Sequence, residues 1–147
     1  TNVVKSEKFS EILQMAMNRY LNGLLTNEQV IEELLNIAKD IARAKDEGNE
    51  MGLTPDELAF YDALVKPQAI KDFYKNDELI AITKELTDTL RKNKTIDWQR
   101  RESARAKMRL LIKRLLKKHK YPPEGMDDAV QTVMTQCELW TDNVMDA

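Results

Sequence analysis

Glycine and proline are scarce in this chain, and they separate stretches whose apolar residues recur every three or four positions. Each of the two occurs four times in 147 residues, whereas residues that favour helix, such as leucine, alanine and glutamate, are abundant. The three-and-four spacing is that of amphipathic helices, and 147 residues suffice for one domain with a continuous core. We therefore expect an all-α protein, a compact bundle of about six to seven helices in which residues 1–147 form a single helical domain.

Turn and capping signals place the first two helices. The apolar pattern of the first helix breaks at Asn22-Gly23. Thr26 and Gln29 have the spacing of a capping box, in which both side chains satisfy free backbone N–H groups, and the second helix is expected to run to about Glu47 and stop at Gly48. The residues expected to face the core are Phe9, Ile12, Leu13, Ala16, Tyr20 and Leu24 in the first helix, and Val30, Leu34, Ile37, Ala38 and Ile41 in the second.

Similar signals mark the helices that follow. Thr54-Pro55-Asp56-Glu57 supplies a cap, a proline at the first helical position and a glutamate three residues after the cap, so a short helix should run to Pro67. A helical piece is expected over Gln68–Tyr74, Asn76 can cap the next helix, and the last helix should begin near Met126. The core residues expected in these two helices are Leu79, Ile82, Leu86 and Leu90, then Val130, Val133, Cys137, Trp140 and Val144.

Positive charge is concentrated on one helix, expected over Trp98–Lys120. Residues 100–120 include ten lysines and arginines and a single acid, Glu102, which gives this segment a net charge of +9. The whole chain has 23 lysines and arginines and 25 aspartates and glutamates, so the residues outside this segment include 13 basic and 24 acidic side chains and carry a net charge of −11. Asp97 is placed to cap this helix, and Pro122-Pro123 ends it. The molecule should therefore be dipolar, and the basic helix could hold a polyanion or an acidic protein surface.

Projection at about 100° per residue separates an apolar arc of the basic helix from its charged face. The arc, assigned to the core, consists of Ala104, Met108, Leu111, Ile112, Leu115 and Leu116. Two basic rows lie outside it, namely Arg105, Arg109, Lys113, Lys117 and Lys120, and Arg100, Lys107, Arg114 and Lys118, with Ala106 and Leu110 between them. Phosphate contact needs such residues but reads no sequence. We expect non-specific contact with the DNA backbone through Arg105, Lys107, Arg109, Lys113, Arg114, Lys117, Lys118 and Lys120.

Two other interpretations of the basic rows remain open. The bases could pair with acids of the same domain, particularly those of the second helix, Glu32, Glu33, Asp40, Asp46 and Glu47. Alternatively, the chain is purely a protein–protein docking module whose basic helix meets an acidic partner. Leu110, an apolar residue between two basic rows, suits a surface on which another helix or subunit packs. Membrane-surface binding is disfavoured because the core needs the apolar arc.

The residue types for catalysis or metal binding do not assemble into a site. His119 is the only histidine, so a helical zinc pair is excluded. Ser103 has neither a glycine elbow nor a histidine base, and Cys137 lies on an apolar arc, as a small buried side chain would. Phe60-Tyr61 and Trp98 could stack on bases, but aromatic residues at helical spacing more often belong to a core. We expect no catalytic residues, no metal site and no cofactor in this chain.

Three segments and a closing run carry a resemblance to a known family. They are Gly52–Leu64 (GLTPDELAFYDAL), Asp97-Trp98 with Arg101–Arg109 (RESARAKMR), and Lys113–Leu116 leading to Tyr121-Pro122-Pro123. Ala129-Val130 and Gln136–Glu138 also fit, although Cys137 stands where we expect alanine. Over about residues 9–142 the chain resembles the C-terminal helical domain of the R (restriction, motor) subunit of type I restriction–modification enzymes.

This resemblance implies a parent that is an ATP-driven, Mg-dependent, site-specific deoxyribonuclease. Its nuclease and motor domains would lie outside this fragment, which has no G-x-x-x-x-G-K-[ST] phosphate loop and neither Asp-x-Lys nor Glu-x-Lys. The implied role of the fragment is non-catalytic assembly. Its implied partners are the methyltransferase core, with modification and specificity subunits, double-stranded DNA, and the other domains of the same motor subunit.

The cellular setting follows from cysteine content and hydropathy. The single cysteine cannot form an internal disulfide, and no N-terminal targeting signal or membrane-spanning run is present. We therefore expect a soluble, cytoplasmic protein without a membrane partner. The start Thr-Asn-Val-Val, with no initiator methionine, suggests a fragment of a longer chain.

Overall fold

The computed structural model describes the backbone of residues 2–67, 69–95 and 97–146, with side chains up to residue 139. Within that part the secondary structure is helical, without strands, as expected. The elements are α1 (Val3–Leu21), α2 (Asn27–Met51), α3 (Pro55–Val65), α4 (Ile70–Phe73), α5 (Asn76–Asn93), the 3-10 turn η1 (Trp98–Arg100), α6 (Glu102–Lys118) and α7 (Pro123–Asp146). The prediction of an all-α bundle is confirmed.

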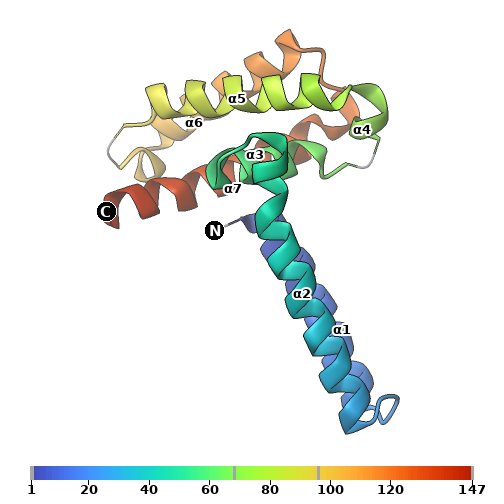
Figure 1. The fold of residues 1–147 in the computed structure, drawn as a ribbon. Coiled ribbons are helices and arrows are strands. Elements are labelled where there is room, and N and C mark those ends of the chain that lie inside the picture. The colour runs from blue at the N-terminus through green and yellow to red at the C-terminus, as the bar shows by residue number, and fades with distance from the viewer. Residues whose placement is uncertain (1, 68, 96, 147) are drawn as a thin grey trace.

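Helices α1 and α2 form a long antiparallel hairpin, here called the arm, which projects from the body formed by the other helices (Figure 1). The prediction that the apolar faces of both helices are buried in a common core is wrong for most of their residues. Ala16 and Val30 are buried, whereas Ile12, Leu13 and Ile41 are 37–44% exposed and Leu24 is 68% exposed. The reason is that over most of their length the two helices pack on each other and not on the body.

Two predictions about the ends of α2 have opposite outcomes. The capping box is present, because the Thr26 hydroxyl accepts a hydrogen bond from the Gln29 N–H (3.1 Å) and the Gln29 side chain accepts one from the Thr26 N–H (2.9 Å). The stop at Gly48 is wrong, because α2 continues to Met51 and Gly52 caps it at a φ of 71°. Gly48 serves close packing instead, since a Cβ there would lie 3.1 Å from the Leu53 carbonyl oxygen.

The body is built around α3, in which every residue from Leu58 to Leu64 is buried. Helices α5 and α7 pack on it, and α6 packs on both of those. The predicted core faces are confirmed where side chains are described, namely Leu79, Ile82, Leu86, Leu90, Met108, Ile112, Leu115, Leu116, Val130, Val133 and Cys137. Ala104 and Leu111 are partly buried against the same core. The side chains of Trp140 and Val144 lie outside the described residues.

The starts of α3, α4 and α5 agree with the sequence prediction to different extents. The capping box of α3, between Thr54 and Glu57, is present. Helix α5 begins at Asn76 rather than after it, and the Asn76 side chain accepts a hydrogen bond from the Tyr61 hydroxyl (2.7 Å). In the piece expected before it, Ile70–Phe73 are helical, while Gln68 lies outside the described residues.

The basic helix does not begin at Trp98 as predicted. Asp97 has a φ of 59° and makes no capping hydrogen bond, and Trp98 begins the turn η1. Trp98 is 1% exposed, so the break in the helix coincides with burial of a large side chain that a continuous helix would hold at the edge of its apolar arc. The basic helix is therefore α6, and it ends at Lys118 rather than Lys120.

Candidate functional site

Helix α6 turns its apolar arc to the core and its basic residues outward, as the sequence predicts. The buried side chains are those of Met108, Ile112, Leu115 and Leu116. Of the eight residues predicted to contact DNA, six are exposed, namely Lys107, Arg109, Arg114, Lys117, Lys118 and Lys120, and the other two, Arg105 and Lys113, are half-buried. These eight residues, seven on α6 and Lys120 just beyond its end, are here called the basic face.

Two residues of the basic face are held by acids of the body. Arg105 forms an ion pair with Glu138 of α7. The Lys118 ammonium group donates a hydrogen bond to Glu85 of α5 (2.7 Å), and the His119 Nε2 lies 2.6 Å from the other oxygen of the same carboxylate. Hydrogen bonds from Lys118 and from His119 hold the pKa of Glu85 below its usual value. This arrangement leaves Arg105 and Lys118 less available than their neighbours.

The other six residues of the basic face make no ion pair with any residue in the described part of the chain. The hypothesis that the basic residues pair with acids of the same domain holds for Arg105 and Lys118, but not for the acids of α2 whose partners are seen. Glu33 pairs with Arg19 (2.8 Å) and Glu47 with Lys5 (2.7 Å), both within the arm. The projection of the arm away from the body explains why (Figure 1).

A shallow open groove of about 670 Å³ follows the first half of α6. Its described lining includes Arg105, Arg109 and Lys113 of one predicted basic row, together with Ala106 and Leu110. Leu110 is 47% exposed. The predicted juxtaposition of an apolar side chain and basic residues is therefore present, and it combines charge with a small apolar contact area.

The remaining candidate residues are structural. Cys137 is fully buried, and burial raises the pKa of its thiol to about 12, so the thiol is neutral and shielded at pH 7. Phe60, Tyr61 and Trp98 are also buried, which excludes base stacking by these aromatic residues. His119 is half-buried beside Glu85, and no group of three potential metal ligands occurs among the residues described. An exposed aromatic residue that the sequence analysis missed is Phe73.

The arm is the larger surface that sequence reasoning missed. Eight large apolar side chains of the arm are exposed, namely Ile12, Leu13, Met15, Leu21, Leu24, Ile31, Leu35 and Ile41. A signal existed, because Ile31 and Leu35 lie outside the single apolar face assigned to the second helix. A helix with apolar residues on two faces needs two partners, and α1 supplies only one.

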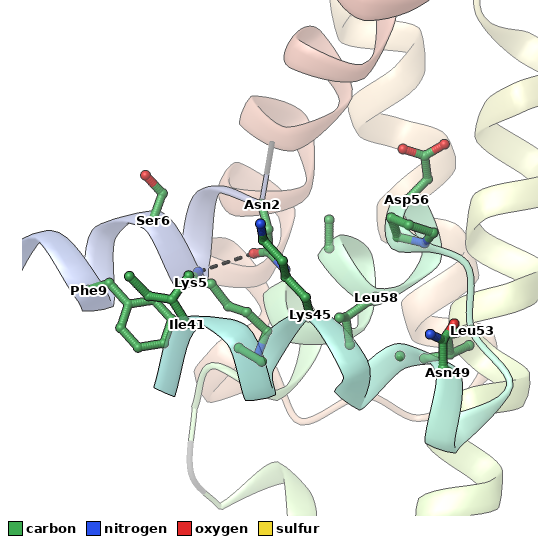
Figure 2. Close-up of a pocket in the computed structure, with 14 residues that line it drawn as sticks. Asn2, Lys5, Ser6, Phe9, Ile41, Lys45, Asn49, Leu53, Asp56 and Leu58 are labelled. Atoms are coloured by element: carbon green, nitrogen blue, oxygen red, sulfur yellow. Dashed lines mark hydrogen bonds between the residues drawn. The ribbon is translucent and has the colours of Figure 1, made fainter. Parts of the chain in front are cut away.

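An apolar pocket of about 650 Å³ lies where the arm joins the body (Figure 2). Phe9 of α1, Ile41 of α2 and Leu58 of α3 are among its apolar walls, and Ser6 and Lys45 also line it. All five are labelled in Figure 2, which shows the pocket open between the two arm helices and α3. None of its residues was singled out as a site from the sequence.

A cluster of polar side chains fixes the root of the arm to the body. Lys5 forms ion pairs with Glu47 of α2 (2.7 Å) and Asp62 of α3 (3.3 Å), and the Asn2 amide donates a hydrogen bond to Asp62 (2.8 Å). Burial raises the pKa of Asp62, although the hydrogen bond from Asn2 and the charge of Lys5 act in the opposite direction. Val3 is tied to α7 through its N–H and the Gln136 side chain (2.8 Å). The direction of the arm is therefore set by several contacts.

Hydropathy adds one further fact about the surfaces. No helix in the described part of the chain combines the length and apolar character required to span a bilayer.

A family model described as type I restriction enzyme HindI endonuclease subunit-like, C-terminal, matches residues 1–143. The type I restriction enzyme HindI endonuclease subunit of Haemophilus influenzae is 42% identical over 138 residues, which are 94% of this chain and 13% of that protein. The putative type I restriction enzyme MjaIXP endonuclease subunit of Methanocaldococcus jannaschii is 37% identical over 130 residues, which are 86% of this chain and 12% of that protein. No solved structure matches.

Proposed function

Because this chain belongs to the family of C-terminal domains of HindI-like type I restriction endonuclease subunits, we propose that it is a non-catalytic assembly domain which also contacts the DNA backbone. In this proposal it docks the motor subunit on the methyltransferase core, and the basic face of α6 binds phosphates without reading sequence. The chain spans 13% and 12% of the two relatives described above. The ATP-dependent motor, the nuclease and their Mg and ATP sites are accordingly proposed for the rest of the parent subunit.

The observation that carries DNA contact is the absence of ion pairs, among the described residues, for six members of the basic face. Arg109, Lys113 and Lys117 belong to one row at intervals of four residues, a spacing that places them along one side of a helix. Arginine and lysine in such a row can bind successive phosphates. Leu110, exposed beside them, gives additional apolar contact to a sugar or a protein surface.

DNA binding is tested with this chain and a short fluorescent duplex of arbitrary sequence across a salt series. We expect the logarithm of the association constant to fall steeply and linearly with the logarithm of the salt concentration. The triple variant Arg109→Glu, Lys113→Glu, Lys117→Glu should lose detectable binding at about 0.15 M salt while keeping its helical circular dichroism. Changing the sequence of the duplex should have little effect, because phosphate contacts carry no base information.

A matched control separates the basic face from net charge. The variant Lys8→Glu, Lys39→Glu, Lys71→Glu changes the net charge by the same amount, but its three sites lie on the arm and on α4. It should bind DNA more tightly than the α6 triple variant at every salt concentration. If the two variants lose affinity equally, the basic face has no particular role.

Purely protein–protein docking is the second candidate function, and the exposed apolar residues of the arm favour it. A pull-down of the modification and specificity subunits by this chain, with and without nuclease treatment, distinguishes the two candidate functions. Capture that survives nuclease treatment and the α6 triple variant supports docking independent of DNA. Capture that nuclease treatment abolishes would contradict direct docking, because DNA would then bridge the proteins.

A further inference from the structure

Helix α2 exposes an apolar stripe on a face that neither α1 nor the body covers. Ile31, Leu35, Ala38 and Ala42, here called the α2 stripe, are all exposed, and their spacing of four, three and four residues places them on one side of the helix. Ile31 and Leu35 are more than half exposed. A stripe with this spacing is the pattern by which a helix packs along a second helix.

The stripe leads into the pocket at the root of the arm. Continuing the same spacing from Ala42 gives Lys45 and Asn49, and both of these line that pocket. On α1 the pocket is lined by Ser6 and Phe9, and Leu13 falls between these two in angle when α1 is projected at about 100° per residue. Leu13 is itself 44% exposed. The stripe and Leu13 thus form an exposed apolar surface that leads to the pocket, and surface and pocket together are here called the arm groove.

The charges beside the α2 stripe select the kind of partner. Four acids of α2 lie beside the stripe on the side that faces away from α1, within about 90° of it in helical projection: Glu28, Glu32, Asp46 and Glu50. None of them makes an ion pair with a described residue. Two bases accompany them, because Lys39 lies in the same sector and Lys45 continues the stripe into the pocket. Four acids against two bases leave the groove and its margin with a net negative charge, so a basic partner is complementary to it.

We propose that the arm groove binds an amphipathic helix of a partner protein, with basic residues over the acidic margin and one large apolar side chain inserted in the root pocket. Its apolar residues, three and four positions apart, would pack on the α2 stripe and complete a three-helix arrangement with α1 and α2. The stretch from Ile31 to Asn49 is roughly 27 Å long at 1.5 Å per residue, which fits about five turns of such a helix. The proposal deepens the docking role proposed above and does not depend on DNA contact.

The test uses synthetic helical peptides of about 18 residues and the 147-residue chain, with binding measured by fluorescence anisotropy at low salt. The first peptide has apolar residues at the three-and-four spacing, lysine and arginine beside them, and a phenylalanine anchor. The second has the same apolar residues with glutamate in place of every base. We expect the basic peptide to bind at least about tenfold more tightly, because several acids of the groove margin lack partners.

Two matched substitutions locate the site. Leu35→Gln removes an apolar side chain from the middle of the α2 stripe without adding a charge, and should weaken binding of the basic peptide by about tenfold or more, since an apolar contact is lost. Leu21→Gln alters a leucine at the end of α1, outside the groove, that is also more than half exposed, and should leave binding unchanged. Both sites are exposed, so circular dichroism should show the same helix content as in the parent chain.

The root pocket is tested separately. Ser6→Phe fills it from an exposed position on α1, so it should remove the preference for a peptide with phenylalanine rather than alanine at the anchor.

Four results would overturn the proposal: no binding of the basic peptide, equal binding of the two peptides, equal effects of Leu35→Gln and Leu21→Gln, or a dimer in sedimentation that Leu35→Gln dissociates. The last would assign the groove to a second copy of this chain. Each result is independent of the duplex experiment, so failure of the groove and failure of DNA contact are distinguishable.

Discussion

Among individual residues, Glu85 links stability to the basic face because its carboxylate holds both Lys118 and His119. We expect Glu85→Gln to lower the free energy of unfolding at pH 7 by less than about 1 kcal/mol, since exposed ion pairs contribute little. The folded-state pKa of Glu85 is lowered below 4.5, so its contribution is present above that pH and is lost as the pH falls through the lowered value. Urea unfolding of both proteins should show a difference at pH 7 that shrinks in acid.

The same substitution should strengthen DNA binding, because it removes a negative charge from the edge of the basic face and releases Lys118. The slope of the logarithm of the association constant against the logarithm of the salt concentration should become steeper by up to about 1, which corresponds to one additional phosphate contact. Asp88→Asn is the matched control, since Asp88 also lies on α5 and pairs with a lysine, Lys92 (3.3 Å). Equal gains in affinity from the two variants would show that only net charge matters.

At the scale of elements, the arm and the body should differ in stability. Within α1 and α2 the buried residues are Ala16, Val30 and Gly48, whereas α3 is buried along seven successive residues. Segments with few buried apolar contacts open more readily than the core. In amide hydrogen exchange, the half of the arm near Gly23 should therefore exchange faster than α3, while the arm root near Lys5 should be intermediate because of its ion pairs. Uniform protection along the chain would contradict this division.

Local signals predicted most helices correctly but failed where tertiary packing decides. The pair Thr26 and Gln29 defines a helix start through contacts only three residues apart, so the sequence suffices there. Gly48 lies within a helix because Leu53 and Leu58 approach its backbone, and Trp98 begins a turn in which it is buried. Both depend on neighbours that helix propensity does not describe. The exposed arm was missed for a related reason, since periodicity identifies an apolar face but not what covers it.

At the candidate site, too, the features set by one helix were predictable from the sequence, and those set by contacts between helices were not. Helical projection correctly turned Arg109 and its row outward, because the apolar arc alone determines that orientation. It could not predict that Glu138 pairs with Arg105, or that Glu85 pairs with Lys118, since each pair joins residues 33 positions apart on different helices. The root pocket is formed by three helices and has no counterpart in any local pattern.

At the scale of the whole molecule, the separation of charge matters more than its sum. The formal net charge is −2 and the isoelectric point is about 5.6, which by themselves predict repulsion from a polyanion at pH 7. The basic segment carries +9 and the rest −11, and the unpaired residues of α6 present that positive charge at the surface. A dipolar molecule of this kind can bind a polyanion through one face while the remainder is repelled.

Retention on immobilised heparin at pH 7 measures this dipole directly. We expect the chain to be retained despite its net negative charge and to elute with increasing salt. Three Lys or Arg to Glu changes each alter the charge by −2, so both triple variants described above have a net charge of −8 (−2 − 6). The variant at Arg109, Lys113 and Lys117 should pass through unretained, and the control variant should still bind. If both elute together, net charge governs binding and the orientation imposed by α6 does not.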